Sequence, residues 1–117
     1  MNTRTKGNTG EDLATDFLIK NGFTILARNY CISKNFQGGE IDIVALKNDV
    51  IHFIEVKSRN TDTYGSGAES VGFTKQKNIR KIATHFLTSN KLYDEVYTSL
   101  DIIEVTNGEI DHIENCF

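Results

Sequence analysis

The chain has 117 residues, of which 38% are hydrophobic and 25% are charged, and its formal net charge is −3. This length suits one core, so we expect residues 1–117 to form a single domain. The composition excludes a low-complexity chain, and no apolar run approaches the roughly 18 residues of a membrane span. The polar N-terminus has no signal-peptide core, and Cys31 and Cys116 make no disulfide framework, so we expect a cytoplasmic protein with reduced thiols and no membrane partner.

The charges are unevenly distributed along the chain. All 13 Lys and Arg residues lie within residues 1–91, whereas residues 92–117 contain seven acids and no Lys or Arg. This asymmetry allows one basic face on a protein that is acidic overall, which is compatible with a nucleic-acid partner. The alternative is a solvated surface on which the charges are simply scattered.

The first half of the chain predicts one helix and three strands. Thr9 is a candidate cap for a helix that ends at Asn21-Gly22. Its apolar stripe consists of Leu13, Ala14, Phe17 and Leu18. Three segments with strand composition follow: FTILARNY (23–30), GEIDIVAL (39–46) and VIHFIEVK (50–57). The last two are apolar on both faces and are separated by a short turn at Asn48-Asp49, which indicates central strands.

The second half predicts a helix and a hairpin. After a polar, glycine-rich stretch at residues 59–73, Thr74 is a candidate cap for a second helix. The stripe of this helix is Ile79, Ile82, Ala83, Phe86 and Leu87. Asn107-Gly108 lies between VYTSLDIIEV (96–105) and EIDHIENCF (109–117) and is typical of a type I′ hairpin turn. The order is helix, three strands, helix, two strands. It predicts one α/β domain with a mixed β-sheet flanked by helices.

The first hairpin gathers charged residues on one face. A two-residue loop at Asn48-Asp49 places Asp42 opposite Glu55 and Glu40 opposite Lys57. Three acids on central strands repel one another unless a cation compensates. Mg²⁺ prefers oxygen ligands and would hold Asp42 and Glu55 together, while Lys57 orients or helps to deprotonate a water molecule. The alternative is that Glu40 pairs with Lys57 while the other acids lie at a wet strand end.

Other candidates carry weaker signals. Glu11 borders the buried edge of the first helix and could reach the metal, or it could complement the helix dipole. Residues 108–111 repeat the letters GEID, and Asp111 there faces another acid, but no lysine accompanies them. We therefore expect the first GEID, at residues 39–42, to carry the chemistry. The three histidines, His52, His85 and His112, are not spaced like metal ligands.

Together, Gly10-Glu11, Gly39-Glu40-Ile41-Asp42 and Glu55-Val56-Lys57 resemble the motifs of the restriction-endonuclease-like PD-(D/E)xK nucleases. Nearly the whole chain resembles the small bacterial YraN-like family of that superfamily, and the resemblance to archaeal Holliday-junction resolvases is more distant. It implies a restriction-endonuclease-like core and a catalytic role for Lys57. It also implies Asp42, Glu55 and the Val56 carbonyl as Mg²⁺ ligands, with Glu11 as an accessory acid at the metal. Ile41 stands where the named motif has proline.

Basic residues near this hairpin could bind a nucleic acid through its phosphates. They are Arg59, Lys75, Gln76, Lys77, Arg80 and Lys81, next to a loop at Tyr64–Gly67. Our hypothesis is an endonuclease that uses Mg²⁺, with Mn²⁺ as a substitute, on DNA, including branched DNA. Cleavage of a junction would call for a homodimer. The alternative is a non-catalytic module that retains the nuclease fold and binds nucleic acid, or a protein through the acidic C-terminal hairpin.

Overall fold

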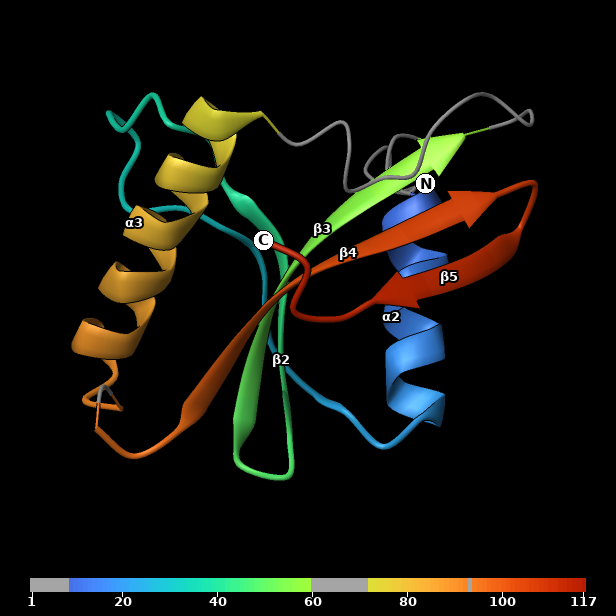
Figure 1. Cartoon of the computed structure of the whole chain (residues 1–117), viewed down its shortest axis with the longest axis horizontal. Helices are drawn as coiled ribbons and strands as arrows, with labels where there is room; N and C mark the ends of the chain where they lie inside the picture. The colour runs from blue at the N-terminus through green and yellow to red at the C-terminus, as the bar shows by residue number, and fades with distance from the viewer. Residues whose placement is uncertain (1–8, 60–71, 93) are drawn as a thin grey trace.

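A computed structural model describes residues 9–59, 72–92 and 94–117 of the chain. Within these residues the elements follow the predicted order of helix, three strands, helix and two strands (Figure 1). The elements are α2 (Thr9–Lys20), β1 (Thr24–Tyr30), β2 (Ile41–Lys47), β3 (Val50–Arg59), α3 (Phe73–Ser89), β4 (Tyr97–Thr106) and β5 (Glu109–Ile113). Neither of these helices is long and apolar enough to cross a membrane.

The five strands form one sheet in the order β1-β2-β3-β4-β5. Neighbouring strands are antiparallel except for β3 and β4, which are parallel. A tight turn cannot join parallel neighbours, and α3 lies in the crossover between them. The predicted α/β fold with a mixed sheet is confirmed, and β2 and β3 are interior strands as their composition indicates.

The turn at Asn48-Asp49 sets the register of the first hairpin. Both residues have positive φ angles, 52° and 66°, as a type I′ turn requires. The turn pairs Lys47 with Val50, and the ladder continues to the pair of Ile43 with Ile54. The predicted register is therefore confirmed along this ladder.

The turn at Asn107-Gly108 sets the register of the second hairpin. Its φ angles are 51° and 85°, and Thr106 pairs with Glu109 directly beside it. Glu104 lies opposite Asp111, as predicted. The registers of both hairpins therefore follow from their turns.

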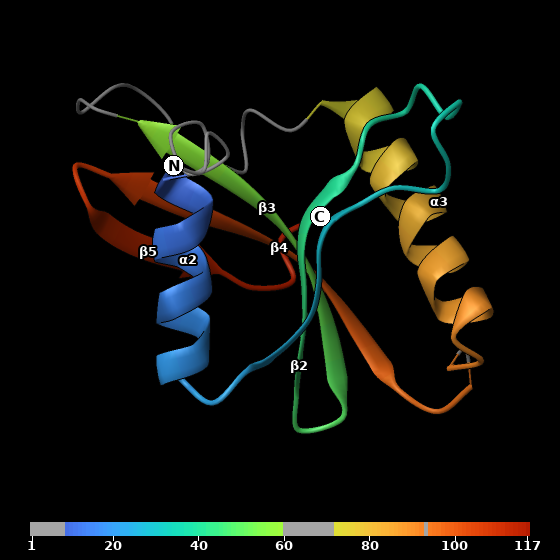
Figure 2. The ribbon, with the colours of Figure 1, turned by 180° about the vertical axis from the view of Figure 1, so that it is seen from behind.

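The two helices cover opposite faces of the sheet, as the front and back views of the ribbon show (Figures 1 and 2). The predicted stripe of α3 is buried against Phe53 and its neighbours on one face. Ala14 and Leu18 of α2 are buried against Ile54 and its neighbours on the other face. Successive residues of β3 thus contribute to different cores, because side chains alternate across a strand. Glu55 and Lys57, two residues apart on β3, therefore share one face of the sheet.

Two local expectations are wrong. Helix α3 begins at Phe73, before Thr74, because the extended backbone of Gly72 already leads into it, and no side chain caps the helix at that position. Leu13 is 37% exposed, because the other stripe residues of α2 already occupy the face toward the sheet. The loop at Tyr64–Gly67 lies outside the described residues.

Candidate functional site

Asp42 and Glu55 line one cleft between the sheet and the start of α3. The cleft has a volume of about 560 Å³, and Glu40, Lys75 and Asn78 also line it. Glu55 is only 6% exposed, whereas Asp42 is half-buried. The structure thus brings together the two carboxylates that the hairpin register predicts, in a partly enclosed space.

The carboxylate of Asp42 interacts with the main chain of β3. Val56 donates its N–H to Asp42 Oδ2 over 2.8 Å, just beyond the last pair of the β2–β3 ladder. Burial, followed by the charge of Glu55, raises the pKa of Asp42 from 3.8 to about 7, although the Val56 N–H works in the opposite direction. A buried acid that resists ionisation beside a second acid would be stabilised as a carboxylate by a bound cation.

Two lysines compensate the charge of Glu55. Lys75, in the first turn of α3, forms an ion pair with Glu55 Oε2. Lys57 Nζ lies 3.7 Å from the same oxygen. Lys57 is two residues after Glu55, so the pleat of β3 places both side chains on one face. The predicted proximity of Glu55 and Lys57 is therefore present, and Lys75 joins them from α3.

Glu40 occupies a different place from the one expected. Strand β2 begins at Ile41, and Gly39 has a φ of 89°, which turns the chain before it enters the ladder. The expected pairing of Glu40 with Lys57 is not part of the ladder. Instead, Glu40 Oε2 accepts a hydrogen bond of 2.8 Å from Asn29 Nδ2.

Asn29 also connects Glu11 to this region. Its Nδ2 lies 3.2 Å from Glu11 Oε1, and Arg28 Nη2 lies 3.4 Å from the same oxygen. The negative charge of Glu11 contributes to the raised pKa of Asp42, after burial, Glu55 and the opposing Val56 N–H. Glu11 therefore acts on the acid pair electrostatically from the first turn of α2.

The residues expected to contact a nucleic acid have different surroundings. Three of them are exposed along α3, at positions that share one side of a helix: Lys77, Arg80 and Lys81. Lys75 and Gln76 lie at the start of the same helix, with Lys75 in the cleft. Arg59 Nη2 lies 3.6 Å from Glu104 Oε2. The basic arc of α3, defined here as Lys77, Arg80 and Lys81, is exposed along one side of the helix, and Lys81 Nζ lies 5.6 Å from the centre of the Phe36 ring.

Residues 10–105 match the model of the uncharacterised protein family UPF0102. The chain belongs to this family. A UPF0102 protein of Clostridium perfringens (strain SM101) is 46% identical over 105 residues, covering 90% of this chain and 81% of the relative. UPF0102 proteins of Dictyoglomus turgidum (38% identical) and Clostridioides difficile (40% identical) align over the full length of both chains. These names state no activity, so the function of this UPF0102 protein has to be argued from its site.

Two contacts near the cleft do not follow from the sequence pattern. Asn29 bridges Glu11 and Glu40, and its position in the chain does not indicate these contacts. Lys75 is a predicted nucleic-acid contact, but its ion pair with Glu55 does not follow from the spacing of the two residues. Both contacts join segments that are remote in sequence.

A second cluster of this UPF0102 protein was also missed. Asp101 on β4 lies within hydrogen-bond distance of His52 and His112. The spacing of these residues along the chain gives no signal. Only the pairing of the strands could have indicated this cluster, because β3, β4 and β5 are neighbours and Asp101 is on the middle one of the three.

Proposed function

We propose that this UPF0102 protein is a Mg²⁺-dependent nuclease that hydrolyses DNA phosphodiester bonds at the Asp42–Glu55 cleft. The observation that carries the proposal is the pair of neighbouring carboxylates with Lys57 Nζ 3.7 Å from Glu55. A restriction-endonuclease-like core is part of the proposal, supported by the element order and by a mixed sheet with a helix on each face. Fold alone would not specify the chemistry.

In this proposal each residue has a distinct task. Asp42 and Glu55 offer the oxygen ligands that Mg²⁺ prefers, and the Val56 carbonyl offers a third. When bound, Mg²⁺ or Mn²⁺ would polarise a phosphate oxygen. Lys57 would orient the attacking water and assist its deprotonation. Glu11 would support the site through its charge. The donor set fits the ion, because burial and then the repulsion by Glu55 raise the pKa of Asp42, and a dication would offset both effects.

A cleavage panel tests the proposal. Duplex, single-stranded and four-way-junction DNA, with RNA counterparts, would be incubated with Mg²⁺, Mn²⁺ or a chelator. Cleavage that requires metal supports the assignment, and the preferred substrate defines the specificity. Junction cleavage should coincide with a homodimer in sedimentation experiments. If no substrate is cleaved with either metal, catalysis is excluded under these conditions and the second candidate below is favoured.

Mg²⁺ affinity should rise as the pH passes through about 7. The pKa of Asp42 is raised to about 7, so at pH 6 the cation has to displace a proton that is largely absent at pH 8. Calorimetry in buffers of different ionisation enthalpy should show tighter binding at pH 8 and release of about one proton at pH 6. Equal affinities at both pH values would contradict the assignment of Asp42 as a ligand.

The metal-free protein should become more stable at pH 8 when Asp42 is replaced by Asn. The pKa of Asp42 is raised from 3.8 to about 7 in the folded protein. The contribution of Asp42 to stability is therefore complete below pH 3.8 and is lost as the pH rises toward about 7. Asn retains an acceptor oxygen for the Val56 N–H but does not ionise. Urea denaturation in chelating buffer should therefore show a higher free energy of unfolding for Asp42→Asn than for the parent at pH 8, and the difference should shrink toward pH 4. A lower free energy of unfolding for Asp42→Asn at pH 8 would contradict the claim that ionised Asp42 destabilises the metal-free protein.

Neutralising the basic arc of α3 should weaken DNA binding for all sequences alike. Phosphate contacts release counterions, so the triple variant K77A/R80A/K81A should lower the slope of log affinity against log salt by up to about 3. Anisotropy measured in an Asp42→Asn background avoids cleavage. Lys20→Ala is the matched control, because Lys20 is exposed in the last turn of α2. An unchanged slope in the triple variant would remove α3 from the interface.

A non-catalytic module is the second candidate, and the two lysines at Glu55 favour it. Lys57 and Lys75 compensate the charge of Glu55 without a metal ion, as a purely structural cluster requires. Such a module would bind nucleic acid through α3, or a protein through the C-terminal hairpin, where Asp111 and Glu114 are exposed. Calorimetric titration with Mg²⁺ separates the candidates, because the module need not bind the ion at millimolar concentration.

A further inference from the structure

A buried carboxylate on β4 is surrounded by two histidines. Asp101 is 0% exposed. Its Oδ2 lies 2.6 Å from His52 Nδ1 and 2.7 Å from His112 Nε2. Its Oδ1 accepts hydrogen bonds from Ser99 Oγ at 2.5 Å and from the Asn115 N–H at 3.0 Å. Burial raises the pKa of Asp101, but these donors outweigh burial and hold the pKa well below its usual range, so the group is ionised.

This cluster is separate from the Asp42–Glu55 cleft. Its members come from three neighbouring strands: His52 from β3, Asp101 from β4 and His112 from β5. The Phe23 ring is 5.0 Å from the His52 ring, and the Phe17 ring is 6.4 Å from the His112 ring. These contacts place the imidazoles on the face that α2 covers, whereas Glu55 faces α3. The two sites therefore lie on opposite faces of β3.

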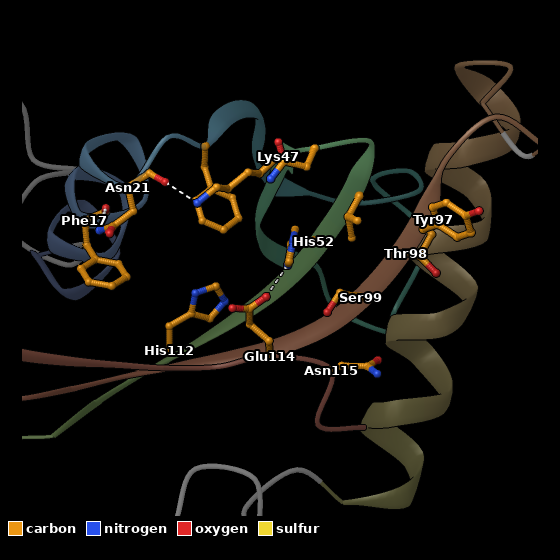
Figure 3. A pocket seen from close by; sticks show the side chains of 13 residues that line it. Phe17, Asn21, Lys47, His52, Tyr97, Thr98, Ser99, His112, Glu114 and Asn115 are labelled. Carbon is orange, nitrogen blue, oxygen red and sulfur yellow. Dashed lines mark hydrogen bonds and ion pairs between the residues drawn. The ribbon is translucent and has the colours of Figure 1, made fainter.

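The histidines line a cleft of about 690 Å³ that also contains Glu114. Figure 3 shows the carboxylate of Glu114 turned toward the space between His52 and His112. Glu114 Oε1 lies 3.9 Å from His52 Nδ1, and its side chain is 59% exposed. A second carboxylate is thus directed at the buried cluster from the side that solvent can reach.

We propose that His52 Nδ1, Asp101 Oδ2, His112 Nε2 and Glu114 Oε1 form a four-coordinate site for a divalent transition-metal ion of the Zn²⁺ class. Imidazole nitrogens and carboxylate oxygens are donors that Zn²⁺ accepts in tetrahedral sites. The donor atoms of the first three residues lie within 4.8 Å of one another. Two neutral imidazoles and two carboxylates would balance the charge of a dication, and Glu114 supplies the second negative charge.

Metal binding would require the donor atoms to rearrange, with Asp101 moving away from the histidines and Glu114, now 3.9 Å from His52, moving closer. Metal–ligand distances of about 2.0–2.1 Å in a tetrahedron place neighbouring donor atoms about 3.3 Å apart. The contacts of 2.6 and 2.7 Å from the histidines to Asp101 would therefore lengthen by roughly 0.6 Å. Without metal, each imidazole shares an N–H proton with Asp101. A nitrogen that held the metal would carry no proton, so the proton of a neutral imidazole would be on the other ring nitrogen.

The proposed ion would join the C-terminal hairpin and Glu114 to the central strand β3. Because the donors come from separate strands, the unfolded chain presents no comparable site. An ion that binds the folded state alone stabilises it in proportion to the logarithm of its concentration. The melting temperature should therefore increase with the concentration of free Zn²⁺.

The test uses the full chain after treatment with a chelator. Calorimetry with Zn²⁺ should show about one ion bound per chain, and Co²⁺ should give the visible absorption bands of a four-coordinate site. His112→Gln should weaken Zn²⁺ binding by roughly tenfold or more. Glu114→Gln changes an exposed side chain, so it should leave the fold intact while weakening binding and altering the Co²⁺ spectrum.

Two variants are controls. His85→Gln removes the remaining histidine, which is hydrogen-bonded to Tyr30, and it should leave Zn²⁺ binding unchanged. Asp42→Asn should also leave Zn²⁺ binding unchanged, which would show that the Zn²⁺ site is distinct from the Asp42–Glu55 cleft. The proposal is overturned if Zn²⁺ and Co²⁺ show no saturable binding. It is also overturned if the His112→Gln and Glu114→Gln proteins bind as the parent does.

Discussion

Replacing Asp42 by Asn should abolish Mg²⁺-dependent cleavage and leave the fold intact. Asn has nearly the same shape and keeps an acceptor for the Val56 N–H, but it removes one of the two charges that would hold the cation. Charge stabilisation of the transition state by a metal is worth several kcal/mol, so the rate should fall by roughly a thousandfold or more. Single-turnover cleavage measures the loss, and circular dichroism checks the fold.

Two further substitutions distinguish metal binding from the activation of the attacking water molecule. Glu55→Gln should remove both Mg²⁺ binding and cleavage, because Glu55 is the buried member of the pair. Lys57→Ala should leave Mg²⁺ binding in place and lower the cleavage rate by about 10²–10⁴. A Lys57→Ala protein that cleaves at the parent rate would exclude Lys57 as the group that assists the water.

The chain contains a matched control for Asp42. Asp111 belongs to the second GEID segment and lies opposite Glu104 in another hairpin. It is exposed, so Asp111→Asn changes the same chemical group outside the cleft. This variant should cleave at the parent rate. If Asp42→Asn and Asp111→Asn reduce cleavage equally, the active site is not the Asp42–Glu55 cleft.

Replacing Asp101 by Ala should destabilise the protein by about 3–5 kcal/mol. The substitution leaves His52, His112, Ser99 and the Asn115 N–H without their shared acceptor. Of these, His52 and Ser99 are buried. An unpaired buried polar group is costly, and here several arise together. Urea denaturation in chelating buffer measures the change without a contribution from metal. Asp111→Ala, at an exposed position, should stay within about 0.5 kcal/mol of the parent.

The pH dependence of the unfolding free energy gives a second measurement of how much Asp101 contributes to stability. Its folded pKa is held below the ordinary 3.8, so its stabilising contribution is present above that value and is lost as the pH falls below it. The difference in unfolding free energy between the parent and Asp101→Asn should therefore narrow below about pH 4. A difference that persists unchanged to pH 2 would mean that the ionised carboxylate is not the source of the stability.

Local signals were sufficient for the elements and most of the register. The turns at Asn48-Asp49 and Asn107-Gly108 need positive φ angles that few residue pairs adopt readily, so they determine which residues face each other. The stripe of α3 was predictable because its five apolar residues recur at helical spacing. Asp42, Glu55 and Lys57 then follow, because their positions depend only on the pairing and the pleat.

The remainder of the site depends on contacts that local signals do not encode. Glu40 leaves the predicted register because Gly39 turns the chain and Asn29 binds the carboxylate. Lys75 reaches Glu55 only because α3 packs over the sheet. The His52–Asp101–His112 cluster joins three strands whose order in the sheet includes a parallel pair, and that order is a property of the fold as a whole.

Parallel pairing of β3 with β4 also sets the order in which the molecule can assemble. The β2–β3 hairpin carries Asp42 and Glu55 and is closed by a two-residue turn, so it can form within microseconds. The β3–β4 ladder joins residues as distant as Val50 and Tyr97, and it must wait for a long loop to close. During synthesis Asp42 and Glu55 can therefore come together before α3 packs on the sheet and places Lys75 beside Glu55. The histidine cluster needs side chains from β3, β4 and β5, so it cannot form before the β3–β4 ladder has closed.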